Sequence, residues 1–481
     1  MDFLSRRALF RSVAATVLLA ACGPLPPTQA PPKPAEPAKS AEAPKPAAPA
    51  PAGPAPTPTL PPVFTPVPQA AGTTKILMRV HWSGGRFNDF QKIINDYNGT
   101  QGTKDKIYLT LERFIAGQAG PIATFIADFQ AGTQEDIYHL NDAYLADLAA
   151  RNFFVAPPQE IQGYIKQHFL ASAIKTGTWQ GKVMGHPTEN QPHMMFLHKK
   201  LFTEAGMDAV KDAPKTYDDI RRLSKALTKK DASGQKTQAG YIEHINSGER
   251  VMVQRMLYQA LEGAPLVDDT KTPPVWDVTS DGARKFTDLI YNIAQDGSGS
   301  AEMGAQNLIW QGAKGGIITH DAWAVVFQVI AAGLPNLINE QHTISLRSSD
   351  GSKAGNISRN YHFLVSSKSK NIDLSWQFLK WMNDGPEYRM QDFQTNVFGF
   401  VPSVKDYPMP KPFPDQMKAA FTQSMGESTQ TAMPVVKGLA EVYNIMRDNY
   451  DALVLKKVNN KEFTERLDAE LKKAMQSAYA N

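Results

Sequence analysis

Three histidines close together in the sequence, His186, His193 and His198, are candidate metal ligands because imidazole nitrogen binds many transition metals. The last two lie five residues apart on a predicted strand, so their side chains should point to opposite faces. We therefore expect hydrogen-bonded or solvated histidines and no metal site. Thiolate ligands are also excluded, since no cysteine follows Cys22.

The signatures of several enzyme classes are missing from the sequence. It contains no Gly-x-x-x-x-Gly-Lys-Ser/Thr phosphate loop, no Gly-x-Ser-x-Gly elbow and no His-Glu-x-x-His helix. The adjacent carboxylates Asp268 and Asp269 lie beside Pro273 and Pro274, in a predicted loop where nothing would set their proton affinities apart. We therefore predict no catalytic residues, no cofactor and no turnover.

Cys22 carries the only thiol of the chain and ends a Leu-Ala-Ala-Cys sequence. It follows an apolar run at residues 13–21 and the basic pair Arg6 and Arg7. The run is too short to span a bilayer, which favours a segment removed on export over a transmembrane anchor. Residues 1–22 are thus predicted to be a lipoprotein signal with lipidation at Cys22, and the arginine pair is similar to a twin-arginine export signal.

Residues 23–72 consist almost entirely of Pro, Ala, Lys, Glu and Thr. This composition cannot build a core, and proline favours an extended backbone that advances about 3 Å per residue. We interpret the segment as a tether that lifts the folded part off a membrane. A proline-rich docking motif for a partner is the alternative.

The folded part, residues 73–481, is long enough for two lobes. The chain has a formal net charge of only +4, and basic and acidic residues are spread through both halves, so no nucleic-acid partner is expected. No segment of this part is long and apolar enough to cross a bilayer. Membrane contact is therefore expected through the lipid alone.

Strands and helices alternate at the start of the folded part. Apolar patterning predicts strands at residues 75–80, 108–111 and 136–140, with helices at 87–97 and 122–129 between them. This order predicts an α/β fold with a mainly parallel sheet covered on both faces.

Polar and aromatic residues follow two of these strands. Trp82 and Ser83 come after the first strand, and Asn141 and Asp142 come after the third. Ligands of open α/β sheets gather at the carboxyl ends of strands. These four residues are therefore candidates for a binding site.

Several later segments are similar to a known family. Residues 185–220 hold Gly-His-Pro, an apolar strand, Lys-Leu-Phe-Thr-Glu-Ala-Gly-Met-Asp and Pro-Lys-Thr-Tyr-Asp-Asp-Ile, and residues 310–323 read Trp-Gln-Gly-Ala-Lys-Gly-Gly-Ile-Ile-Thr-His-Asp-Ala-Trp. A serine-lysine loop and a helix follow at 366–381, then Val-Pro-Ser at 401–403 and a closing helix at 463–475. In this order and spacing they resemble the extracellular solute-binding proteins of ABC importers, in the group that includes maltose-binding protein.

The chain departs from the family pattern at two places. His198 precedes Lys199 where members often have Tyr-Asn before the lysine, and Asp321 and Ala322 precede Trp323 where members have a glycine. We therefore do not assume that this chain binds the same ligand as the better-known members of the family.

The resemblance implies a two-lobed type II periplasmic-binding-protein fold whose lobes are discontinuous in sequence. The first lobe would comprise residues 73–187 and 359–398, and the second lobe 188–358 and 399–481. Strands crossing between the lobes would form a hinge, and a solute bound in the cleft would favour the closed form.

Residues at these crossings and strand ends suit a sugar, which presents apolar C–H faces to aromatic rings and hydroxyls to polar side chains. The candidate rings are Trp82, Trp323 and Tyr361, and the candidate polar residues are Ser83, Asn141, Asp142, Glu189, Asn190 and Asp321. The remaining tryptophans are interpreted as structural: Trp376 and Trp381 in a helix core, and Trp276 and Trp310 in packing or at the surface.

We therefore predict a monomeric substrate-binding lipoprotein of an ABC importer, held outside the cytoplasm in the bacterial cell envelope. It would deliver a small solute, preferably a carbohydrate, to a membrane permease.

The same fold binding a polyamine, an opine-like compound or an iron chelate is an alternative, because ring faces also attract ammonium groups. A cleft in which carboxylates outnumber neutral donors would favour that alternative. An envelope-bound glycoside hydrolase is a second alternative and would need two cleft carboxylates about 5 to 10 Å apart.

Overall fold

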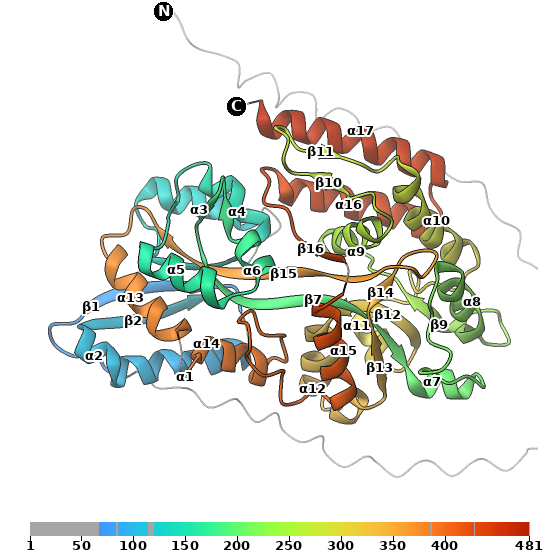
Figure 1. The fold of residues 1–481 in the computed structure, drawn as a ribbon, viewed down its shortest axis with the longest axis horizontal. Helices are drawn as coiled ribbons and strands as arrows, with labels where there is room; N and C mark the ends of the chain where they lie inside the picture. The colour runs from blue at the N-terminus through green and yellow to red at the C-terminus, as the bar shows by residue number, and fades with distance from the viewer. Residues whose placement is uncertain (1–66, 83–84, 114–119, 385–386, 428, 481) are drawn as a thin grey trace, which may run out of the picture. The chain divides into compact units, whose positions relative to one another are not determined.

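The structure is a computed structural model that describes residues 67–82, 85–113, 120–384, 387–427 and 429–480 (Figure 1). The predicted signal with Cys22, most of the predicted tether, and Ser83 lie outside these ranges. None of the helices within them combines the length and apolarity that a membrane crossing requires.

The strands among the described residues differ in length. The shortest have two residues, and the two longest have thirteen residues each. They are β1 (Thr74–Val80), β2 (Ile107–Arg113), β3 (Ile137–Asn141), β4 (Phe154–Val155), β5 (Thr178–Trp179), β6 (Lys182–Val183), β7 (His186–His198), β8 (Lys229–Lys230), β9 (Lys236–Ile242), β10 (Val267–Asp268), β11 (Val275–Trp276), β12 (Gly315–Asp321), β13 (Gln341–Ile344), β14 (Leu346–Arg347), β15 (Ala354–Ser366) and β16 (Thr429–Ala432).

Helices connect most of these strands. They are α1 (Gly85–Gly99), α2 (Gln101–Asp105), α3 (Gly120–Ala131), α4 (Asp142–Ala149), α5 (Gln159–His168), α6 (Ala171–Thr176), α7 (Lys199–Glu204), α8 (Tyr217–Leu227), α9 (Gly248–Leu261), α10 (Asp281–Gln295), α11 (Gln306–Gln311), α12 (Gln328–Ala331), α13 (Ile372–Asn383), α14 (Arg389–Asp392), α15 (Asp415–Met425), α16 (Leu439–Val454) and α17 (Asn460–Tyr479). Short π-helices, η1 (Trp323–Phe327) and η3 (Phe393–Val397), and the 3-10 helix η2 (Pro335–Ile338) complete the set.

The central sheet has the strand order β2-β1-β3-β15-β7-β12-β9-β8. Strand β1 runs parallel to β2 and β3, and β9 runs parallel to β12. In contrast, β15 is antiparallel to both β3 and β7, and β7 is antiparallel to β12. The predicted strands and helices at the start of the folded part are confirmed. The expectation of a mainly parallel sheet is wrong, because the two long strands enter its middle in opposite directions.

Strands β7 and β15 join the two parts of this sheet and run side by side through its middle (Figure 1). The first half of β7 pairs with β15, and its second half, from His193 to Leu197, pairs with β12. The second half of β15, from Tyr361 to Val365, pairs with β3. The middle of β15 therefore lies beside the carboxyl end of β3, and the middle of β7 lies beside the carboxyl end of β12.

Separate apolar clusters stabilise the two parts of the sheet. One gathers residues of β1, β2, α1, α13 and the second half of β15, and the other gathers residues of β9, β12, α9, α10, α16 and α17. Such clusters bury apolar surface at about 25 cal/mol per Å², which is the main favourable term in folding. Each part of the sheet thus has its own core.

Most of the tryptophans predicted to be structural are buried in apolar clusters. Trp376 and Trp310 are each 1% exposed, and Trp276 is 7% exposed. The prediction for Trp381 needs correction, because this ring is only partly buried. It packs on Tyr97 with centroids 4.7 Å apart, and the guanidinium of Arg389 lies 4.0 Å from its centroid. Trp381 therefore covers the edge of the core.

Candidate functional site

Three predicted site residues are neighbours across three adjacent strands. Tyr361 of β15 is paired with Asn141 of β3 on one side and with Glu189 of β7 on the other. Asn190 follows Glu189 and is paired with Asn360. The sheet itself therefore places Asn141, Tyr361 and Glu189 in a row, although they are far apart in the sequence.

The ring of Tyr361 is the aromatic centre of this row. It stacks on His81 with centroids 4.6 Å apart, and His139 stacks on His81 at 5.1 Å. The guanidinium of Arg359 lies 5.6 Å from the centroid of Tyr361. Tyr361 is only partly buried, whereas every other residue of β15 is buried.

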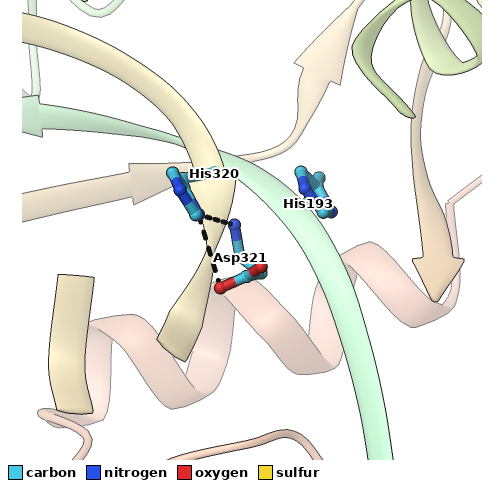
Figure 2. Close-up of side chains that lie close together, drawn as sticks. All are labelled: His193, His320 and Asp321. Atoms are coloured by element: carbon cyan, nitrogen blue, oxygen red, sulfur yellow. Dashed lines mark hydrogen bonds and ion pairs between the residues drawn. The ribbon is translucent and has the colours of Figure 1, made fainter. Parts of the chain in front are cut away.

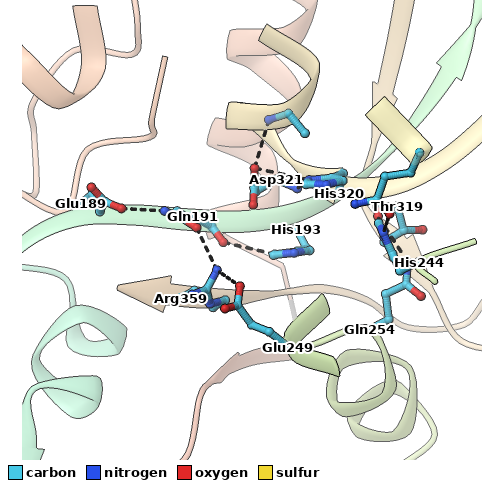
Figure 3. A network of polar contacts seen from close by, with 12 residues as sticks. Glu189, Gln191, His193, His244, Glu249, Gln254, Thr319, His320, Asp321 and Arg359 are labelled. Atoms are coloured by element: carbon cyan, nitrogen blue, oxygen red, sulfur yellow. Dashed lines mark hydrogen bonds and ion pairs between the residues drawn. The ribbon is translucent and has the colours of Figure 1, made fainter. Parts of the chain in front are cut away.

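A chain of charged and polar side chains connects β15 with β7 and α9 (Figure 3). Nη1 of Arg359 lies 2.5 Å from a carboxylate oxygen of Glu249 and donates to Oε1 of Gln191 at 3.1 Å. The amide of Gln191 in turn donates to Glu189 at 2.6 Å. Charge-assisted hydrogen bonds of this kind are about twice as strong as neutral ones, so they orient Glu189.

Many polar atoms in this region are buried without a hydrogen-bond partner among the described residues. They include both carboxylate oxygens of Asp142, Oε2 of Glu189, Oδ1 of Asn190, both side-chain polar atoms of Asn360, and Nε and Nη2 of Arg359. Buried polar atoms in proteins are nearly always paired, and leaving one unpaired costs about 1 to 3 kcal/mol. Within β7 and β15 and at the carboxyl end of β3, such atoms provide what a surface for a polar ligand needs.

Burial also changes the ionisation of two of these carboxylates. Burial raises the pKa of Asp142 to about 7, a rise that Arg359 opposes and Glu249 increases. Burial likewise raises the pKa of Glu189 to about 7 against the lowering effect of Arg86. Near neutral pH both groups can therefore donate as carboxylic acids or accept as carboxylates.

Asn141 is positioned by the start of a helix. Its side-chain oxygen accepts a hydrogen bond from the backbone N–H of Ala143 at 3.2 Å and so caps α4. Asp142 is the first residue of that helix and is fully buried. The strand-to-helix junction thus explains why an Asn-Asp pair stands at this point of the sequence.

The two tryptophans predicted to stack on a ligand lie in different surroundings. Trp82 is 1% exposed and packs on His139 at 4.3 Å and on Phe90 at 4.9 Å. Trp323, the first residue of η1, is partly buried beside Phe327, and the guanidinium of Arg250 lies 6.0 Å from its centroid. Trp323 is the more accessible of the two rings, and both stacking roles stay predictions.

Residues outside the sequence predictions also belong to this region. Arg86 on α1 lies with its guanidinium 4.3 Å from the ring centroid of Phe398 and 5.2 Å from that of Phe400. Its Nε and Nη2 are buried and have no hydrogen-bond partner in the part of the chain that the structure describes. Arg359 could have been nominated from its place at a predicted crossing, whereas nothing in the sequence marks Arg86 or Glu249.

The histidines considered as metal ligands are separated, as expected. His186 lies 3.8 Å from a carboxylate oxygen of Asp384, and His198 packs on Trp310 at 5.5 Å. His193 instead lies near His320 and Asp321, the last two residues of β12 (Figure 2). Asp321 is thus next to the predicted site and beside a histidine pair that the sequence does not reveal.

Solved structures share this fold at low sequence identity. A cyclic alpha-maltosyl-1,6-maltose binding protein from Arthrobacter globiformis matches with a TM-score of 0.67 and 14% identity, covering 84% of this chain and 100% of that one. The sugar-binding protein MalE of Xanthomonas citri matches with a TM-score of 0.67 and 16% identity, covering 84% and 98%. An ABC substrate-binding protein of Listeria monocytogenes in complex with cycloalternan matches at 0.67 and 13%, covering 84% and 99%. The fold is therefore the two-lobed type II fold of periplasmic sugar-binding proteins.

None of the curated protein sequences compared matches the chain. A family of proteins described as bacterial extracellular solute-binding proteins does match, over residues 92–422. This span covers more than half of the chain and includes the strands that carry the candidate site. Proteins of this description bind solutes outside the cytoplasm. The chain belongs to the family of bacterial extracellular solute-binding proteins.

Proposed function

We propose that this protein captures a carbohydrate at the row formed by Asn141, Tyr361 and Glu189. The observation that carries the proposal is the combination of the partly buried Tyr361 with buried polar atoms that have no hydrogen-bond partner among the described residues. A sugar ring matches this combination, since its apolar face can lie on an aromatic ring while its hydroxyls pair with Asp142 and Glu189. The solved relatives that bind maltose-type and other oligosaccharides support the same class of ligand.

The charges in the region favour a neutral ligand over a polycation. The carboxylates are those of Asp142, Glu189, Glu249 and Asp321, and they are accompanied by the guanidinium groups of Arg86, Arg250 and Arg359. The neutral hydrogen-bonding side chains include Asn141, Asn190, Gln191, Asn360 and Tyr361. Because the carboxylates do not outnumber the neutral donors, and three arginines accompany the four carboxylates, a polyamine would meet nearly as many cations as anions.

The lobes proposed from the sequence explain how such a ligand would be held. Residues 73–187 and 359–398 would form one lobe, and residues 188–358 and 399–481 the other. The separate apolar clusters and the long strands β7 and β15 support this division. A ligand that contacts Asn141 of one lobe and Asp321 of the other would stabilise the closed arrangement by its differential affinity for it.

Delivery and anchoring complete the proposal. The protein would act as the monomeric substrate-binding component of an ABC importer, attached to the membrane through a lipid on Cys22 and spaced from it by residues 23–72. It would hand the solute to a membrane permease and would not transform it. The membership of the chain in an extracellular solute-binding family supports this role.

The test is a ligand screen with the full-length Cys22→Ser protein by thermal shift and calorimetry. Maltose, mannobiose and cyclic oligosaccharides are compared with spermidine, and a ligand at a hundred times its Kd should add about 2.7 kcal/mol to the unfolding free energy. Sugars should bind and be recovered unchanged. Binding of spermidine alone would refute the carbohydrate assignment, and a hydrolysed sugar would show an enzyme instead.

A pair of asparagine variants locates the site. Asn141→Ala removes the asparagine of the proposed row and should weaken sugar binding. Asn98→Ala is the control, because Asn98 is a buried asparagine whose side chain is already bonded to the backbone of Leu109 at 2.8 and 2.9 Å. The control should lose stability and keep its affinity.

A further inference from the structure

We propose that His193, His320 and Asp321 form a binding site for a divalent transition cation of the Zn²⁺ class. Each residue offers one ligand atom, and these atoms all lie within 4.8 Å of one another (Figure 2). This inference goes beyond solute binding and does not depend on the identity of the solute.

The sheet brings the three side chains together. His193 lies on β7 and is paired directly with Asp321 on the antiparallel neighbour β12, and His320 precedes Asp321. Nδ1 of His320 is 3.3 Å from Oδ1 of Asp321. Ligand atoms that surround one zinc ion at about 2.0 to 2.1 Å lie roughly 3.3 Å apart in a tetrahedral arrangement. Two of the three donors therefore already have the required spacing, and the donor atom of His193 lies within 4.8 Å of both.

The nitrogen of His193 that would bind the ion is free in the described structure. Its Nδ1 lies 3.3 Å from the backbone oxygen of Gln191, to which an N–H at this position donates. That hydrogen bond leaves Nε2 with a lone pair, and Nε2 is buried without a partner among the described residues. A backbone carbonyl that fixes the tautomer of a histidine is the usual outer support of a metal ligand.

His320 and Asp321 supply the other donors. Nδ1 of His320 accepts the backbone N–H of Asp321 at 2.8 Å, and an ion bound at Nδ1 would replace this hydrogen bond. Oδ1 of Asp321 accepts from the backbone N–H of Ala324 at 3.2 Å, which orients the carboxylate. Both side chains are buried, with His320 fully inaccessible and Asp321 3% exposed.

The charges around the cluster act in opposite directions on a cation. Two imidazole rings and the carboxylate of Asp321 supply the donors. The guanidinium of Arg250 lies 6.0 Å from the ring centroid of Trp323, two residues after Asp321, and its positive charge reduces the attraction of the cluster for a cation.

The donor set decides the kind of ion. Two nitrogen atoms and one carboxylate oxygen suit Zn²⁺, Co²⁺ or Fe²⁺, whereas Ca²⁺ and Mg²⁺ prefer oxygen ligands alone. Three protein ligands leave at least one coordination position for water or for an oxygen atom of a bound solute. Trp323 follows two residues after Asp321. An ion here would therefore lie next to the predicted stacking residue.

The experiment uses the full-length Cys22→Ser protein without any sugar. After dialysis against a chelator, Zn²⁺ is titrated calorimetrically, and Co²⁺ is titrated by visible absorption as a probe of the ligand geometry. One ion per chain should bind, with the absorption of a tetrahedral or five-coordinate site. His193→Gln and Asp321→Asn should each weaken binding of the ion by more than about 100-fold. Removing a group that only supports a metal ligand already weakens binding by up to about 100-fold, and these variants remove a ligand itself.

His198→Gln is the matched control, because His198 lies buried on the same strand but packs on Trp310. Its affinity for Zn²⁺ should equal that of the parent protein, and circular dichroism checks that every variant is folded. Absence of stoichiometric binding by the parent would overturn the proposal. Equal affinity in the Asp321→Asn protein would overturn it as well, since the ion would then bind elsewhere. A protein that binds sugar but no metal would refute this inference while leaving the proposed function intact.

Discussion

Single side chains show how similar residue types acquire different roles from their surroundings. Trp82 is enclosed by His139 and Phe90, whereas Trp323 is partly open beside Phe327. An enclosed indole stabilises its own core, and only an accessible one can exchange water for a sugar face. Trp323 is therefore the residue through which stacking is best tested.

Trp323→Ala should weaken sugar binding by roughly 1 to 3 kcal/mol, because an aromatic platform is lost. Calorimetry with the best ligand of the screen measures the change. Trp376→Ala serves as the comparison, since Trp376 is 1% exposed in the core formed with β1, β2 and α1. It should reduce the unfolding free energy by about 3 to 5 kcal/mol and leave affinity unchanged. Undiminished affinity in folded Trp323→Ala protein would contradict the stacking role.

Glu243 should make stability depend on pH. Burial raises its pKa to about 7 from the ordinary 4.5, against the lowering effects of Lys236 and of the backbone N–H of Ala301, which donates to it at 2.7 Å. Because the folded state binds the proton more tightly than the unfolded state, this contribution to stability is complete below about pH 4.5 and is lost as the pH rises to about 7.

Urea denaturation at pH 5 and pH 8 measures this dependence. Between these values the unfolding free energy of the parent protein should fall by roughly 1 to 3 kcal/mol more than that of Glu243→Gln. Asp142 and Glu189 are present in both proteins, so the difference isolates Glu243. Parallel pH profiles would show that Glu243 is not protonated in the folded state.

At the scale of elements, capping and apolar faces decide where helices begin and what they cover. Helix α17 begins after Asn459, whose side chain accepts from the backbone N–H of Glu462 at 3.0 Å, while Glu462 accepts from the backbone N–H of Asn459 at 2.9 Å. Phe463 and Leu467 lie on its buried face. This reciprocal capping fixes the start of the helix that closes one of the two cores.

Asn459→Ala should lower the unfolding free energy by about 1 kcal/mol, because it leaves a backbone N–H of the first turn without its acceptor. Chemical denaturation measures the loss. Lys461→Ala is the control in the same turn, since the side chain of Lys461 is 83% exposed. Equal stability of the two variants would show that the cap contributes nothing.

At the scale of the whole molecule, β7 and β15 connect two parts that have separate cores. If these parts are the proposed lobes, a ligand should compact the particle while the content of helix and strand stays constant. Small-angle scattering of the Cys22→Ser protein with and without the best ligand measures the radius of gyration, and circular dichroism measures the secondary structure. An unchanged radius at saturating ligand would rule out hinge closure.

Anchoring can be separated from binding at the same scale. In cells, Cys22→Ser should move the protein from the membrane fraction to the soluble fraction, because no thiol remains to carry a lipid. Ligand affinity should be unchanged, since residues 23–72 separate Cys22 from the folded part. A variant that stays in the membrane fraction would contradict the lipoprotein prediction.

Local patterns in the sequence were sufficient for much of the fold. The apolar spacing that predicts β1, β2, β3, α1 and α3 depends on neighbouring residues, and each of these elements is present. The order of motifs pointed to the solute-binding family, which the comparison confirms. The positions of Asn141 and Asp142 also followed from local signals, because a polar pair at a strand-to-helix junction is visible in the sequence.

Only the tertiary structure decided which side chains meet. Gln191 and Arg359 are separated by 168 residues, yet their side chains are bonded because β7 and β15 are neighbours. His193 lies near His320 and Asp321 through the register of β7 with β12, whereas the sequence suggested grouping it with His186 and His198. The antiparallel pairing of β7 with β15 could not be predicted from the sequence for the same reason. Strand pairing is a contact between distant segments, and the periodicity of each segment shows its buried face without showing its partner.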